Sequence, residues 1–202
     1  MRRNRKFERF ASQYQPDAPC GASPPPLPRS LAAGGFDEFM ARFAGCVFEG
    51  GLYRIHTRDS SAVANRWVAD AYPEFAARAH CFASSWMGNQ FALDRERTGK
   101  GGENLVLLLE PGTAMGLEVP TSFAEFHDDE LVDESDAALA APFFREWAAA
   151  NPGTVPLAPS DCVGYKVPLF LGGADTVDNL EVIDLDVYWT LTAQLRRQVE
   201  QI

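Results

Sequence analysis

Several features that would reveal a function directly are scarce or missing in this chain of 202 residues. It has only three histidines and four cysteines. The cysteines form no CxxC pair or regular framework, so we expect reduced, mostly buried thiols at Cys20, Cys46, Cys81 and Cys162. No apolar run is near the length of about 18 residues that a membrane-spanning helix requires. Polar residues follow the basic start MRRNRK, where a signal peptide would be apolar. The sequence therefore predicts a cytoplasmic protein without a membrane partner.

Acidic residues are in excess, and the excess is uneven along the chain. The formal net charge is −10 at pH 7. Residues 1–29 contain six basic and two acidic residues, which leaves 12 basic and 26 acidic residues for the remainder. Such an acidic body repels nucleic acid and anionic lipid but attracts a basic partner. The same charge also suits a simpler purpose, which is to keep a small domain soluble.

Composition divides the chain near residue 34. The stretch PDAPCGASPPPLPRSLAAGG is rich in Pro, Gly, Ser and Ala and has no apolar periodicity. We therefore expect residues 1–34 to be a disordered leader. The remaining length and the 46% apolar composition suit a single domain over residues 35–202.

Apolar periodicity predicts an α+β fold for that domain. A helix is expected over residues 36–43, a glycine-turned hairpin over 46–56 and a helix near 60–79 that Pro73 interrupts. Four strand-like runs follow, joined by short turns, and predict a mostly antiparallel meander.

The second half predicts helices and one further strand. Ser122 and Glu125 form a capping-box pattern, and Pro142 must either kink the next helix or begin a new one. The run from Gly164 to Gly173 is expected to be an edge or a non-ladder segment and not a central strand, because Pro168 lacks an amide hydrogen. A strand over 179–184 then leads into a C-terminal amphipathic helix, capped by Asp184 or Asp186. We expect this helix to pack on the sheet through Val187, Trp189, Leu191 and Leu195.

Catalytic patterns are weak. His127 with Glu130, and His56 with Asp59, have the spacing of two metal ligands on one helical face, but neither is joined by a second ligand pair. His80 and Cys81 would point to opposite faces of a strand and cannot form a dyad. The TGKG run at 98–101 lacks the other residues of a phosphate-binding loop. We expect no catalytic residue, metal or cofactor, and a metal-dependent hydrolase is the weaker alternative.

Several longer runs resemble a known family. They are GGLYRIH, WMGNQFALD, LLLEPGTAMGLEVPTSFAEFHDDELV and the closing block with PLFLGG, NLEVID and a YW pair. In this order they resemble the type VI secretion immunity proteins that neutralise DNase effectors, over roughly residues 45–198. A regulatory or scaffold domain of the SUKH-like, cell-wall-regulator-like superfamily is the alternative resemblance.

The resemblance implies a non-catalytic antitoxin that binds a cognate toxin, most simply a nuclease. Because a nuclease cleft is built to hold phosphates, an acidic surface with apolar anchors is its natural complement. Two acidic runs fit this description, although each also suits a solvated helix face or a helix cap. The predicted partner-binding residues are Asp128, Asp129, Glu130, Asp133 and Glu134 in the first run, and Asp175, Asp178 and Glu181 in the second.

Overall fold

A six-stranded antiparallel sheet forms the centre of the computed structural model, which describes residues 6–199. Its strands are adjacent in the order in which they follow along the chain. The predicted hairpin and the predicted meander are both confirmed, and they join into one sheet. The strands are β1 (Val47–Phe48), β2 (Tyr53–Ile55), β3 (Ala79–Ser85), β4 (Gln90–Thr98), β5 (Asn104–Glu110) and β6 (Met115–Ser122).

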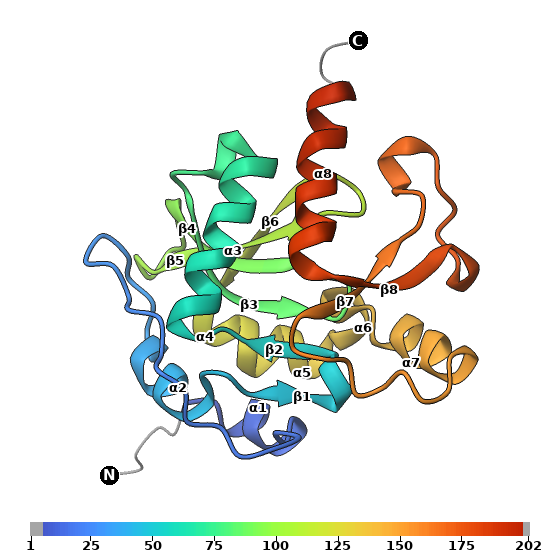
Figure 1. Ribbon diagram of the computed structural model, residues 1–202. Helices are drawn as coiled ribbons and strands as arrows, with labels where there is room; N and C mark the ends of the chain where they lie inside the picture. The colour runs from blue at the N-terminus through green and yellow to red at the C-terminus, as the bar shows by residue number, and fades with distance from the viewer. Residues whose placement is uncertain (1–5, 200–202) are drawn as a thin grey trace.

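Helices cover both faces of this sheet. Helices α3 (Arg58–Ala71) and α8 (Leu185–Val199) lie together on one face (Figure 1). A separate two-stranded antiparallel sheet, β7 (Asp161–Tyr165) and β8 (Leu180–Asp184), leads into α8. The α+β fold is therefore confirmed. The opposite face is covered by α1 (Glu8–Gln13), α2 (Phe36–Phe43), α4 (Phe123–Glu125), the π-helical turn η3 (Phe126–Glu130), α5 (Leu131–Asp133), α6 (Ser135–Leu139) and α7 (Ala141–Ala150).

The central strands bury side chains on both faces. Successive side chains of a strand point to opposite sides. Phe91 and Leu93 of β4 therefore enter a core rich in phenylalanine, whereas Ala92 enters the core beneath α3 and α8. Among the described helices, none combines the length and the apolar character needed to cross a lipid bilayer.

Several local features predicted from the sequence are present in the structure. Ser122 and Glu125 form the predicted capping box. Pro142 lies in the first turn of α7, so it begins a new helix and does not kink an existing one. The carboxylate of Asp184 accepts hydrogen bonds from the backbone amides of Asp186 and Val187, and it thereby caps α8. Gly164 and Tyr165 end β7, which belongs to a two-stranded sheet, and the residues around Pro168 lie outside its ladder, so the run is no part of a central strand, as expected.

The expectation of a disordered leader is wrong for residues 6–34. Phe7, Phe10 and Tyr14 are at most 2% exposed and belong to the phenylalanine-rich core. Phe10 lies within α1 (Glu8–Gln13), and Phe7 and Tyr14 flank it at its two ends. A bridge between Pro16 and Phe48 then ties the segment to β1. The segment is therefore part of the folded unit, while Arg2, Arg3 and Arg5 lie outside the described residues.

The cysteines are only partly as expected. Cys81 and Cys162 are free and buried, which confirms the prediction for these two. Cys20 and Cys46 instead form a disulfide, with their Cα atoms 5.2 Å apart. The prediction of four reduced thiols is wrong because the N-terminal segment folds back beside the start of β1, a contact that sequence spacing does not reveal.

His127 lies at the centre of the phenylalanine-rich core and is fully buried. Its Nδ1 lies 2.8 Å from the carbonyl oxygen of Phe123, so it must donate there. Its Nε2 then accepts the hydrogen bond of the Tyr53 hydroxyl at 3.0 Å. The rings around it come from α1, α2, β3 and the α4–η3 segment, and they belong to Phe7, Phe10, Phe39, Phe82, Phe123 and Phe126.

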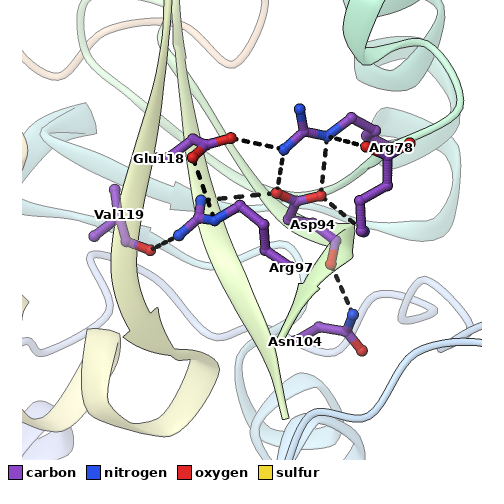
Figure 2. Close-up of polar contacts among 7 residues, drawn as sticks. Arg78, Asp94, Arg97, Asn104, Glu118 and Val119 are labelled. Atoms are coloured by element: carbon purple, nitrogen blue, oxygen red, sulfur yellow. Dashed lines mark hydrogen bonds and ion pairs between the residues drawn. The ribbon is translucent and has the colours of Figure 1, made fainter. Parts of the chain in front are cut away.

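An ion network centred on the buried Asp94 joins β4, β6 and the residue just before β3 (Figure 2). The Asp94 side chain is 0% exposed and accepts two hydrogen bonds from the guanidinium of Arg78, at 2.6 and 3.2 Å. Arg78 and Arg97 both also reach Glu118 on β6. Hydrogen bonds from Arg78 to Asp94 and Glu118 raise the pKa of the guanidinium. The network therefore ties β4 to β6 across the intervening β5, and it ties both to the residue that precedes β3.

We predict that Phe10→Ala lowers the free energy of unfolding by about 3 to 5 kcal/mol, because it empties a fully buried ring site. Urea denaturation of the full chain measures the change. Ser12→Ala on the exposed side of the same helix is the control, and we expect it to cost less than about 0.5 kcal/mol. Equal stability of Phe10→Ala and the parent protein would show that the segment is not packed.

We predict that Asp94→Asn lowers the free energy of unfolding by about 3 to 5 kcal/mol, because Arg78 and Arg97 then lose their buried counter-charge. Thermal or urea denaturation measures the loss. Glu118→Gln removes a carboxylate whose side chain is 52% exposed, so we expect that variant to lose no more than about 1 kcal/mol. Similar losses in the two variants would contradict the special role of Asp94.

Stability should fall as the pH falls below about 6.5, the ordinary pKa of histidine. Burial lowers the pKa of His127 to about 3, and those of His56 and His80 to about 4. Between these values and about 6.5 the unfolded chain binds protons that the folded chain excludes. The stabilisation is therefore complete above about pH 6.5 and is lost towards pH 4, by up to about 1.4 kcal/mol per pH unit for each histidine.

Urea denaturation at about pH 7.5 and about pH 5.5 measures this loss. His80→Gln is the matched variant, because Nε2 of His80 is buried without a hydrogen-bond partner. We expect it to show a shallower pH dependence than the parent protein. An identical slope would show that His80 titrates normally in the folded state.

Candidate partner-binding surface

The first acidic run lies on the segment from α4 to α5, and one of its carboxylates faces the N-terminal helix. Asp128 accepts hydrogen bonds from the backbone amides of Phe7 at 2.7 Å and Phe10 at 3.1 Å. It therefore supplies the acceptor that the first turn of α1 lacks, since the residue before this helix makes no side-chain cap. Asp128 is half-buried and is engaged within the chain.

Two further carboxylates of this run pair with a single arginine of α1. Arg9 donates hydrogen bonds to Asp129 at 2.7 Å and to Asp133 at 2.6 Å. All three side chains are at least half exposed, so each pair contributes little to stability in water. Part of the charge predicted for a partner is thus neutralised internally. Of the remaining two residues, Glu130 is half-buried and Glu134 is exposed.

The second acidic run lies between β7 and β8 and reaches into β8. Asp175, Asp178 and Glu181 are all exposed. The Tyr165 hydroxyl donates a 2.6 Å hydrogen bond to Asp175. Burial of the Tyr165 ring, together with this carboxylate, raises the pKa of the phenol. This end of the molecule therefore presents acidic side chains to solvent.

The loop that carries these carboxylates is fixed by its own hydrogen bonds. The side-chain amide of Asn179 donates to the carbonyls of Val167 and Ala174, both at 2.8 Å, and accepts from the amide of Val167 at 3.0 Å. Lys166 donates to the carbonyl of Asp178 at 2.8 Å. Such a loop loses little conformational freedom when a partner binds.

Exposed apolar side chains gather in the same part of the chain. Of the seven large apolar residues that are notably exposed within residues 6–199, six lie between residues 167 and 199, and the other is Met115. The prediction that Val187 and Leu191 pack on the sheet is wrong, because they are 48% and 44% exposed. Leu195 is half-buried. We call Asp175, Asp178, Glu181, Val182, Val187 and Leu191 the C-terminal surface.

Aromatic residues take the scaffold role that the aliphatic residues were expected to have. Trp189 is 1% exposed, donates to the carbonyl of Gly88 at 3.0 Å and stacks on Trp67 of α3. Tyr188 is also buried. Because these bulky rings occupy the inner face of α8, the aliphatic side chains at four-residue spacing lie outside it. The expected scaffold role of Trp189 is confirmed.

A cavity of about 310 Å³ lies beside the first turn of α8, between α3 and the β1–β2 edge of the sheet. Its lining includes His56, Trp67 and Asp186, and the Trp67 indole donates to Asp186 at 2.7 Å. The ring nitrogens of His56 lie 3.0 Å from the Ser60 hydroxyl and 2.8 Å from the Gln90 side chain. Both ring nitrogens of His56 are therefore already engaged within the chain, and the side chain forms part of the cavity wall.

The pairs His127 with Glu130 and His56 with Asp59, which have metal-ligand spacing in the sequence, do not have the surroundings of a metal site in the structure. Both ring nitrogens of His127 and of His56 are already in hydrogen bonds. Within residues 6–199, no group of three or more His, Cys, Asp and Glu side chains lies close enough to hold a metal ion. Cys81 lies in the core beneath α3, whereas the ring of His80 faces Phe36 in the other core.

Comparison with solved structures gives a fold relative. The crystal structure of Atu4351 from Agrobacterium tumefaciens is similar to this chain, with a TM-score of 0.59. The similarity covers 93% of this chain and 88% of the other, at 16% sequence identity. At that identity the likeness concerns the fold alone. A search of curated proteins found no significant match.

Comparison with protein families gives a match to one family model. Residues 122–196 match the model described as "T6SS immunity protein Tdi1, C-terminal". The matched segment begins at the Ser122 capping box and extends through most of α8, so it contains both acidic runs and the C-terminal surface. The resemblance to type VI secretion immunity proteins is therefore confirmed for residues 122–196 of this chain.

Proposed function

We propose that this protein is a non-catalytic immunity protein that binds a cognate type VI secretion toxin, a DNase, in the cytoplasm and blocks its active site. The match of residues 122–196 to the immunity family carries this proposal. The supporting feature is the C-terminal surface, which combines fixed carboxylates with exposed apolar side chains inside the matched segment. No cofactor is needed for inhibition by binding alone.

The charge and rigidity of this surface suit a nuclease cleft. Residues 160–195 contain six acidic residues and one basic residue, Lys166. A cleft that binds DNA is lined by basic side chains, so opposite charge speeds encounter and favours the correct orientation. Apolar side chains such as Val187 and Leu191 then provide the dehydrated centre that most of the binding energy requires.

We assign the first acidic run, from Asp128 to Glu134, a secondary part in the contact with the toxin. Asp128, Asp129 and Asp133 already bind the N-terminal segment, which lowers the charge they offer to a partner. Glu130 and Glu134 complete this run. In the proposed complex the carboxylates at Asp175, Asp178 and Glu181 contribute more than the helical run does.

The triple variant D175K/D178K/E181K tests the proposal. The product of the adjacent gene is the candidate toxin, and the parent protein should protect cells that express it and abolish its cleavage of DNA in vitro. We expect the triple variant to bind at least about a hundredfold more weakly, because attraction becomes repulsion at three sites. The parent protein should bind more weakly at physiological than at low ionic strength, and in the triple variant this salt dependence should shrink or reverse.

The matched control changes the net charge by the same amount elsewhere. Asp37, Asp59 and Asp70 are exposed on α2 and α3, and their replacement by lysine should leave the affinity within about fivefold. A parallel variant, D129K/E130K, measures the contribution of the helical run. Absence of any complex between the parent protein and the candidate toxin, with no protection of cells, would refute the proposed function for this pair.

A further inference from the structure

Strand β8, which carries Glu181 and Val182 of the C-terminal surface, presents an open edge. It pairs with β7 along one side, from Leu180 opposite Tyr165 to Asp184 opposite Asp161. Within residues 6–199 no other strand pairs with it. An open edge leaves backbone amides and carbonyls available to a further strand.

The neighbouring hydrogen bonds show which backbone groups face outward. Leu185 donates to the carbonyl of Ser160, and Lys166 donates to the carbonyl of Asn179. In an antiparallel ladder hydrogen-bonded pairs alternate with pairs that are not hydrogen-bonded. The bonded pairs are therefore Cys162 with Ile183 and Gly164 with Glu181.

The pair between them, Val163 with Val182, is consequently not hydrogen-bonded. This agrees with the amide of Val163, which points the other way and donates to the carbonyl of Trp86 at 2.8 Å. The amide and the carbonyl of Val182 must then point away from β7. Among the described residues neither group has a backbone partner, and the Val182 side chain is 42% exposed.

The other long edge of the protein is less open to pairing. Strand β6 is the last strand of the large sheet, but Pro120 within it has no amide hydrogen to donate. Its Glu118 is also held by Arg78 and Arg97. Strand β8 contains no proline, and no ion pair involves its side chains among the described residues.

We propose that β8 receives an extended segment of the toxin as an additional strand, paired through the backbone of Val182. This inference rests on the proposed function and specifies how the toxin is held. The incoming strand would carry both apolar and basic side chains. An apolar residue would cover Val182, and basic residues would meet Glu181 beside it and Asp178 and Asp184 at the strand ends, all of which are exposed.

Charge complementarity argues for a basic strand as the occupant. Glu181 and Asp184 lie on β8 itself, and Asp175 and Asp178 lie on the loop that precedes it. Backbone pairing supplies affinity in strand addition, whereas the flanking side chains select the sequence. An acidic or neutral strand would leave these carboxylates without compensation and would bind more weakly.

The variant Val182→Pro tests the pairing directly. Proline removes only the outward amide of residue 182, because the β7–β8 ladder uses the amides of Glu181 and Ile183. We expect the affinity for the toxin to fall at least about tenfold, with the circular dichroism spectrum and melting temperature retained. Val182→Thr keeps the amide and the branched shape, and it should bind within about threefold of the parent.

Hydrogen exchange of the unmodified protein gives a second measurement that does not depend on how Val182→Pro folds. The amide of Val182 should exchange readily in the free protein and become protected in the complex. Lack of added protection at residues 180–184 would overturn strand addition, as would full affinity in a folded Val182→Pro variant. If D175K/D178K/E181K still weakens binding in that case, the proposed function survives and only the pairing mode is wrong.

Discussion

The position of His127 constrains much of this structure. A neutral imidazole that is fully buried needs a partner for each nitrogen, and these partners are the carbonyl of Phe123 and the hydroxyl of Tyr53. The first bond lies within the α4–η3 segment, and the second holds that segment against β2. With His127 turned inward, the next side chain, Asp128, points at α1 and caps it. One buried ring therefore determines how the acidic segment lies and what holds the N-terminal helix.

This arrangement also redistributes the charge of the surface. The basic N-terminal segment provides Arg9, which engages Asp129 and Asp133 of the acidic helix. The carboxylates between β7 and β8 are held differently, because the loop that carries Asp175 and Asp178 is fastened by the neutral side chain of Asn179. Their charge stays available to a partner. Internal pairing thus distinguishes two acidic runs that look alike in the sequence, since the first is largely engaged with the N-terminal segment and the second is exposed.

Local signals in the sequence predicted the fold well, and non-local contacts account for the errors. The Ser122 capping box, the Asp184 cap, the hairpin and the meander depend on neighbouring residues, and all were correct. The packing of Phe7 and Phe10 and the disulfide of Cys20 depend on residues far along the chain. The outward position of Leu191 follows from the bulk of Trp189 and Tyr188 on the inner face of α8. For the candidate site, the sequence indicated the acidic residues but not which of them are paired internally.

The acidic residues around β8 have a consequence for self-association as well as for partner choice. An open edge with an exposed Val182 would ordinarily invite pairing with a second copy of the same strand. In such a pair Glu181 and Asp184 of one copy would approach the carboxylates of the other, and like charges on neighbouring strands are unfavourable. Pairing with a basic strand would be favourable, since each carboxylate gains a counter-charge. The same side chains that discourage pairing between identical copies would therefore favour a basic partner, so that an edge without proline remains usable for recognition.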